Sequence, residues 1–243
     1  KTALSFDDVL LVPQSSGINS RKDVDLSTEL SDKLKLSIPI ISTNMDSVTG
    51  VEMAVALSKL GGMGILPRFD PPEVQAEKIS KIKKAGAVTA ASLGCKEGYE
   101  KTAEILVSAG ADVLLMDVAH GHLDKFINAT KVITEKYGKS ITIIAGVIAT
   151  YEGACALFEA GAHCVRVGVG PGSICTTRIM TGHGVPQITA ISEAFRAAKK
   201  YGKTIIADGG MKNSGDIVKA LAAGASAVTL GYLLAGTDEA PGN

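Results

Sequence analysis

The sequence predicts a single α/β domain, a TIM-type (β/α)8 barrel that spans residues 1–243. A chain of 243 residues has the usual length of one such barrel. Short apolar segments alternate along the whole chain with amphipathic segments rich in Ala, Lys and Glu. Most intervals between successive apolar segments are roughly 22 to 30 residues long, which is the length of one strand–helix unit. The number of these units favours a closed barrel over an open doubly wound sheet.

The apolar segments are predicted to be strands because most are apolar on both faces, as strands covered by helices are. They are residues 38–43, 62–66, 87–94, 112–118, 141–146, 164–170, 204–210 and 227–231. The predicted helices are residues 51–60, 72–84, 98–109, 125–137, 151–160, 188–201 and 214–223. The chain stops soon after the last predicted strand, so we expect the last helix of the barrel to be absent from it.

Composition and charge exclude several classes of partner. The formal net charge is zero, which gives no indication of a nucleic acid or an anionic membrane surface. No apolar run has the length of a membrane span, and the first residues do not resemble a signal peptide. The four cysteines lie far apart in the sequence, without metal-binding spacing. We therefore expect a cytoplasmic protein that binds neither nucleic acid nor membrane.

Residues 168–178, Gly-Val-Gly-Pro-Gly-Ser-Ile-Cys-Thr-Thr-Arg, carry most of the chemistry in this chain. Their glycines and proline exclude a regular helix or strand over this segment. Backbone amides without side chains can approach a phosphate or a cation closely. Ser173, Cys175 and Thr177 add hydroxyls and a thiol to the same loop. The alternative is a glycine-rich turn with an incidental cysteine, which the Ser-x-Cys-Thr-Thr continuation disfavours.

Active sites of such barrels are built at the carboxyl ends of the strands. Asn44 and Arg68 follow predicted strands at this edge of the barrel, and Asp117 lies at the end of one. Asp208 precedes two glycines there, which suits a carboxylate that accepts hydrogen bonds from vicinal ribose hydroxyls; its alternative role is to cap the next helix. His163 lies at the opposite end of its strand and is expected to be solvated.

Five segments resemble the IMP dehydrogenase/GMP reductase family, and they occur in the same order along essentially the whole chain. They are residues 6–13 (Phe-Asp-Asp-Val-Leu-Leu-Val-Pro), 44–46 (Asn-Met-Asp), 117–122 (Asp-Val-Ala-His-Gly-His), 168–178, and 207–210 (Ala-Asp-Gly-Gly). The most specific is Gly-Pro-Gly-Ser-Ile-Cys-Thr-Thr-Arg. The resemblance implies an oxidoreductase of purine metabolism that acts at C2 of the base of a purine nucleoside monophosphate.

The resemblance also implies roles for individual residues. Cys175 matches the nucleophile that forms a covalent thioimidate with C2, and Thr177 matches the hydroxyl that helps to activate water or ammonia. The implied nucleotide-binding residues are Thr43, Met45, Ser173, Asp208, Gly210 and Gly231. The implied residues for the nicotinamide cofactor, NADPH or NAD, are Asp117, Arg166, Gly168 and Gly170. Backbone carbonyls of Gly170, Gly172 and Cys175 match a site for a monovalent cation such as potassium, and members of the family generally form homotetramers.

The sequence departs from the family pattern at several places. Val147 follows Gly146 where the family commonly has Asn, and Tyr232 replaces a Ser, Asn or Gly at the phosphate edge. The mobile flap of the dehydrogenases is expected beyond residue 243. The CBS modules that most dehydrogenases insert between the second helix and the third strand are also expected to be absent, because residues 84–87 run straight through.

The direction of the reaction is the least determined feature. The absent CBS insertion, Arg68-Phe69 and Thr181-Gly182 resemble GMP reductases, which convert GMP and NADPH to IMP and ammonia. Residues 184–190 and 205–242 resemble IMP dehydrogenases, which convert IMP, NAD and water to XMP and NADH. On balance the sequence favours the reductase, with the dehydrogenase as the alternative. A non-catalytic nucleotide-binding barrel is a more remote alternative.

Overall fold

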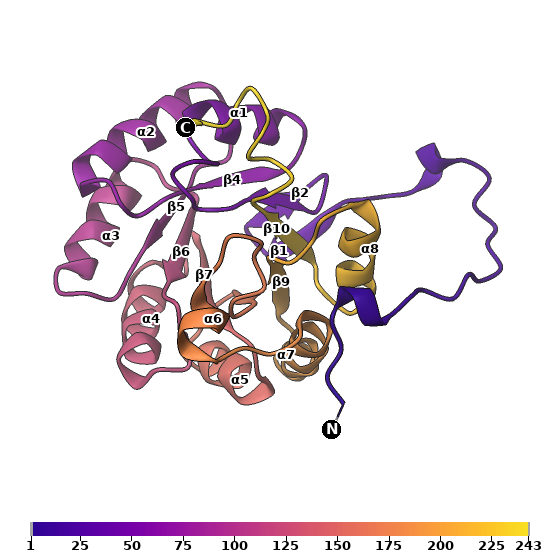
Figure 1. Cartoon of the computed structure of the whole chain (residues 1–243). Helices are drawn as coiled ribbons and strands as arrows, with labels where there is room; N and C mark the ends of the chain where they lie inside the picture. The colour runs from indigo at the N-terminus through magenta and orange to yellow at the C-terminus, as the bar shows by residue number, and fades with distance from the viewer. Residues whose placement is uncertain (1, 243) are drawn as a thin grey trace.

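Eight parallel strands close into a barrel in the computed structural model, which describes residues 2–242 (Figure 1). The strands follow one another around the barrel in chain order, and the last pairs with the first. They are β3 (Ile40–Ser42), β4 (Met63–Leu66), β5 (Ala90–Leu93), β6 (Val113–Asp117), β7 (Thr142–Ile148), β8 (Cys164–Val167), β9 (Thr204–Asp208) and β10 (Ala227–Leu230). The predicted fold class is therefore confirmed, and each predicted strand overlaps an observed one.

Helices surround the strands and cover their outer faces (Figure 1). They are α1 (Val51–Lys59), α2 (Pro72–Lys84), α3 (Tyr99–Ser108), α4 (Asp124–Tyr137), α5 (Tyr151–Glu159), α7 (Gln187–Tyr201) and α8 (Ser214–Ala222). Side-chain caps begin two of them: Thr150 accepts a hydrogen bond from the Gly153 amide, and Asn213 accepts one from the Asp216 amide. The described residues after β10, 231–242, form turns without a helix. Among the described residues, no helix combines the length and apolarity that crossing a membrane requires.

The glycine-rich segment 168–178 contains one element that the sequence prediction missed. A short helix, α6 (Thr177–Thr181), begins inside residues 168–178, where a regular helix was excluded. The glycines occupy only the first part of that segment, so nothing prevents helical backbone after Thr176. Two predicted strands, 164–170 and 204–210, also end early, at Val167 and Asp208. Glycines with positive φ follow both ends and turn the chain out of the sheet.

An antiparallel hairpin closes the amino end of the barrel, and the sequence analysis did not predict it. Its strands are β1 (Thr28–Ser31) and β2 (Leu34–Leu36). Leu30, Leu34 and Leu36 are buried together with the inward-facing side chains of the barrel strands. Access to the interior is therefore left to the carboxyl end.

Alternation of side chains along the strands decides which residues reach that carboxyl end. On β6, Leu115 lies in the interior cluster, whereas Met116 packs outward against the helices. The next inward position on this strand is Asp117. The same alternation on β8 and β9 turns Arg166 and Asp208 inward. The barrel interior is consequently apolar toward the amino ends of the strands and charged at their carboxyl ends.

Candidate active site

A cavity of about 420 Å³ opens at the carboxyl ends of the strands. Its volume lies within the roughly 300–1,000 Å³ that is typical of small-molecule sites. The ends of β6, β8, β9 and β10 and the loop 168–178 form much of its wall. Every site residue predicted from the sequence lines this cavity: Thr43, Met45, Asp117, Arg166, Gly168, Gly170, Gly172, Ser173, Cys175, Thr177, Asp208, Gly210 and Gly231. The structure brings these residues together, and their individual roles remain predictions.

Cys175 is half-buried and faces the cavity next to a hydroxyl. Its Sγ donates a hydrogen bond to Thr177 Oγ1 over 3.2 Å. Its backbone amide donates to the Gly172 carbonyl at 3.1 Å, which closes a tight turn around the thiol. Arg178 connects the start of the loop 168–178 to the segment before α7, since its Nε donates to the Val169 carbonyl and its Nη2 to the Val185 carbonyl. The thiol therefore has a defined position and a neighbouring group that can exchange a proton with it.

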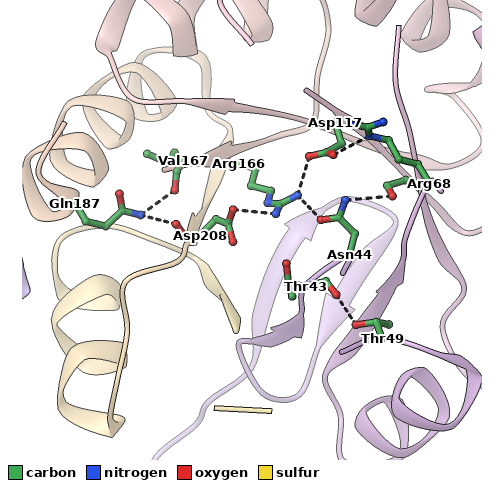
Figure 2. Close-up of polar contacts among 10 residues, drawn as sticks. Thr43, Asn44, Thr49, Arg68, Asp117, Arg166, Val167, Gln187 and Asp208 are labelled. Atoms are coloured by element: carbon green, nitrogen blue, oxygen red, sulfur yellow. Dashed lines mark hydrogen bonds and ion pairs between the residues drawn. The ribbon is translucent and has the colours of Figure 1, made fainter. Parts of the chain in front are cut away.

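Arg166 lies at the centre of a buried charge network on the cavity floor (Figure 2). Its side chain is only 7% exposed. Nη2 lies 2.8 Å from Asp208 Oδ2, and Nη1 lies 3.1 Å from Asp117 Oδ1. Nη1 also donates to Asn44 Oδ1 at 2.8 Å. One guanidinium thus connects the two carboxylates that the sequence assigned to the ribose and to the cofactor.

The network continues from Asp117 to a second arginine. Arg68 Nε donates to Asp117 Oδ2 at 3.2 Å, so cations and carboxylates alternate across the floor (Figure 2). Asn44 Nδ2 donates to Ser92 Oγ at 3.2 Å, which orients its oxygen toward Arg166. Pairing of this kind is required when charges are buried, because an unpaired one carries a large desolvation cost.

Asp208 is held by its backbone as well as by its carboxylate. Gln187 Nε2 donates to the carbonyls of Asp208 and Val167, each at 3.0 Å, and so joins the ends of β8 and β9 (Figure 2). Gly168 lies against this junction, and a Cβ atom there would be 2.8 Å from Gln187 Nε2. Burial raises the pKa of the Asp208 carboxyl above its usual value of 3.8, and the Arg166 guanidinium opposes that shift.

The turn that directly follows Asp208 offers bare backbone. Gly209 and Gly210 have φ values of 80° and 86°, a conformation that favours glycine. A Cβ atom on Gly209 would lie 3.1 Å from the Gly172 amide nitrogen, so this turn and the loop 168–178 approach closely. Backbone amides in such a setting suit a phosphate. Ser173 and Gly231 line the same cavity.

Different groups in the cavity suit a nicotinamide cofactor and a monovalent cation: charged side chains suit the cofactor, and backbone carbonyls suit the cation. Asp117 and Arg166, with two glycines beside them, give a charged wall with close backbone access, which suits the hydroxyls and amide of a nucleotide cofactor. The Gly172 carbonyl already accepts from the Cys175 amide and keeps one lone pair for a cation. Within residues 2–242, no group of three His, Cys, Asp or Glu side chains is arranged to hold a metal ion.

Two expectations about individual polar residues can be compared with the structure. His163 is half-buried rather than solvated, because its Nδ1 accepts a hydrogen bond from the Ile143 amide at 2.9 Å; that prediction was wrong. Asp208 does not cap the next helix, whose cap is Asn213. Gln187 was missed as a site residue, because residues 184–190 were considered only for the direction of the reaction.

The fold and the cavity together define a barrel enzyme with a thiol, a hydroxyl and a buried charge network at the carboxyl edge. Residues 3–243 match the family model described as "IMP dehydrogenase / GMP reductase domain". The chain belongs to the IMP dehydrogenase/GMP reductase family, whose members are NAD(P)-dependent oxidoreductases.

Known relatives agree with this assignment. The inosine-5'-monophosphate dehydrogenases of Staphylococcus epidermidis (strain RP62A), Staphylococcus haemolyticus and Staphylococcus aureus (strain Mu50) are each 36% identical to the chain. Each alignment spans 369 residues and covers 100% of this chain and 75% of the relative. The resemblance found in the sequence is thereby confirmed at the level of the family.

Proposed function

We propose that this chain forms the catalytic barrel of an enzyme that oxidises IMP at C2 with NAD and water, yielding XMP and NADH. The observation that carries the proposal is the shared cavity of Cys175, Thr177 and Asp208, which gives a nucleophile, a proton-exchanging hydroxyl and a ribose acceptor in one site. The names of the relatives support the dehydrogenase direction.

The nucleotide is proposed to lie across the cavity, with its phosphate at the Gly209–Gly210 turn and its base at the Cys175 thiol. Asp208 accepts hydrogen bonds from the ribose hydroxyls, and Arg166 keeps this carboxylate oriented. Ser173, Gly210 and Gly231 surround the phosphate. Thr43 and Met45 lie beside the nucleoside, which leaves the base directed toward Cys175.

The reaction begins when the Cys175 thiol gives up its proton and Sγ adds to C2 of the purine ring. The hydrogen on C2 then leaves with both electrons of its bond, and a thioimidate between Sγ and C2 remains. Water adds to C2 and gives up a proton, for which the Thr177 hydroxyl is positioned. The C2–Sγ bond breaks, the electron pair returns to sulfur, and XMP is released with the thiol restored.

The nicotinamide cofactor supplies the acceptor for the hydride when it is bound. In this proposal Asp117, Arg166, Gly168 and Gly170 hold it against the nucleotide. Carbonyls of Gly170, Gly172 and Cys175 would bind a monovalent cation such as potassium, for which neutral oxygen donors are sufficient. The cation would fix the loop that carries the thiol.

The dehydrogenase is preferred here over the reductase that the sequence favoured. The absent insertion between α2 and β5 is the main reductase-like feature, and it bears on regulation rather than chemistry. The alignments of 369 residues are longer than the 243-residue chain, which supports a single barrel domain without the CBS modules. NAD is the matching cofactor. A cytoplasmic homotetramer is proposed as in the family.

A mass-spectrometric experiment on the full-length protein tests the nucleophile. Incubation with IMP and NAD, followed by acid quenching, should trap a nucleotide on the peptide that contains Cys175. The Cys175→Ser variant should trap none and should lose turnover. Cys95→Ser is the matched control, since Cys95 is also half-buried but does not line the cavity. Trapping on another residue, or turnover by the Cys175→Ser variant, would contradict the proposal.

Turnover assays of the same protein distinguish the two directions and the non-catalytic alternative. The dehydrogenase predicts NADH formation from IMP and NAD. Release of ammonia from GMP with NADPH would instead identify the reductase. A protein that binds IMP but reacts with neither pair of substrates would be a nucleotide-binding barrel.

A further inference from the structure

The aromatic ring of Phe6 packs behind the glycine turn that follows β9. Phe6 belongs to the three-residue 3-10 helix η1 (Phe6–Asp8), yet it is only 5% exposed. A Cβ atom built on Gly210 would lie 3.4 Å from Phe6 Cε2 and 3.3 Å from Pro171 Cβ. Gly210 therefore lies against both the ring of Phe6 and the proline of the loop 168–178.

Hydrogen bonds to two helices fix η1 in this place. The Leu4 amide donates to Thr189 Oγ1 at 2.8 Å, and the Thr189 amide donates to the Leu4 carbonyl at 3.2 Å. Lys219 Nζ donates to the Phe6 carbonyl at 2.9 Å. The residues that follow η1 leave the barrel surface (Figure 1), and Leu10 is 86% exposed. The chain is thus anchored at Phe6 in particular and not along its whole first segment.

The turn that Phe6 supports has no side chains of its own to fix its shape. Gly209 and Gly210 are consecutive glycines with positive φ. Glycine loses more conformational freedom on ordering than any other residue, so such a turn depends on its neighbours for rigidity. Phe6 and Pro171 are the neighbours that a side chain at Gly210 would meet first.

We propose that Phe6 is a positioning residue for the phosphate of the nucleotide, because its ring holds the Gly209–Gly210 turn in the shape that directs backbone amides into the cavity. This inference rests on the proposed function, which puts the phosphate at Gly210. Loss of the ring leaves space behind the turn, and the amides are then no longer preorganised for an anion. A ligand without a phosphate does not use these amides.

Calorimetric titration of the full-length protein with IMP and with inosine tests the proposal. In the Phe6→Ala variant the Kd of IMP should rise about tenfold or more, as expected when a hydrogen bond to a charged group is lost. The Kd of inosine should change by less than about twofold, which is below half a kilocalorie per mole. In turnover, KM for IMP should rise while kcat at saturating IMP stays close to that of the wild type.

Phe195→Ala is the matched control. The Phe195 ring packs against Gly224, which follows the C-terminus of α8, whereas Gly210 precedes its N-terminus. It removes the same number of atoms from behind a glycine with positive φ, away from the cavity. The control should bind IMP and inosine as the wild type does.

A second variant keeps the test decisive if Phe6→Ala does not fold. Thr189→Val removes only the hydroxyl that accepts from the Leu4 amide, and it should give the same selective loss of IMP affinity with a smaller factor. Equal weakening of IMP and inosine by either variant would overturn the inference. If the wild type itself binds inosine as tightly as IMP, the phosphate site of the proposed function fails instead.

Discussion

The guanidinium of Arg166 and the carboxylate of Asp208 form an ion pair of 2.8 Å on the floor of the cavity. Their side chains are 7% and 18% exposed, so water screens the pair only weakly. Asp117 engages the other terminal nitrogen of the same guanidinium at 3.1 Å. One cation therefore compensates two carboxylates that would otherwise face each other across the barrel rim.

Replacing Arg166 with methionine should destabilise the fold by about 3–5 kcal/mol, because Asp208 is left without a cation and Asp117 keeps only Arg68. Thermal unfolding at neutral pH measures the loss. Lys78→Met is the comparison variant. Lys78 pairs with Asp70, and both side chains are 33% exposed, so this ion pair should contribute less than about 1 kcal/mol to stability. Equal losses in the two variants would contradict the central role of Arg166.

The affinity for the nucleotide should depend on pH through Asp208. Burial raises the pKa of this carboxyl, so it takes up a proton at a higher pH than an exposed aspartate does. In the proposed function the ionised form accepts hydrogen bonds from both ribose hydroxyls, and the protonated form accepts fewer. KM for IMP should therefore rise as the pH falls from neutral. The Asp208→Asn variant should have a higher KM and should lose this part of the pH dependence, while the titration of the phosphate itself remains.

The raised pKa of Asp208 should favour the folded state in acid, although it weakens nucleotide binding there. The folded-state pKa of Asp208 lies above its unfolded value of 3.8, so its ionisation costs stability at neutral pH. As the pH falls through the raised pKa, this cost is relieved. Denaturation curves should show a smaller loss of stability on acidification in the wild type than in Asp208→Asn.

Gln187 should tolerate an apolar replacement better than an acidic one. Its Nε2 donates to two carbonyls, while its Oε1 is buried without a hydrogen-bond partner among the described residues. Gln187→Leu loses two hydrogen bonds but also removes the unsatisfied oxygen, and we expect a loss of about 1–2 kcal/mol. Gln187→Glu directs acceptors at acceptors and should cost about 3 kcal/mol or more. Urea denaturation of both variants gives the order, and a more stable Gln187→Glu variant would contradict the assigned contacts.

His163 should make the fold less stable in mild acid. Burial, with Lys203 and Lys33 nearby, lowers its pKa, and its Nδ1 must stay unprotonated to accept from the Ile143 amide. The unfolded state takes up a proton near pH 6.5, before the folded state does. The free energy of unfolding should therefore fall as the pH drops below about 6.5. Lys203→Met should make this fall smaller, since it raises the folded-state pKa of His163; an unchanged or steeper fall would argue against this origin.

The alternation of segments was sufficient to predict the barrel and the edge at which its polar residues gather, and the family resemblance supplied most of the individual site residues. Alternating segments recur at the length of one strand–helix unit, and the carboxyl ends of parallel strands share one edge. Asp117 and Asp208 end their strands and Cys175 follows one, so the three could be expected together. The β1–β2 hairpin escaped prediction because its strands are too short to give a clear alternating pattern.

What only the tertiary structure decided is which of these side chains meet. Arg166 was expected at the cofactor, but its contact with Asp208 depends on the closure and register of the strands around the barrel. The packing of Phe6 on Gly210 joins residues at opposite ends of the chain. Local patterns record the period of a helix or strand and the turn chemistry of glycine. They contain no information on the register between neighbouring strands, and that register brings one guanidinium within reach of two carboxylates.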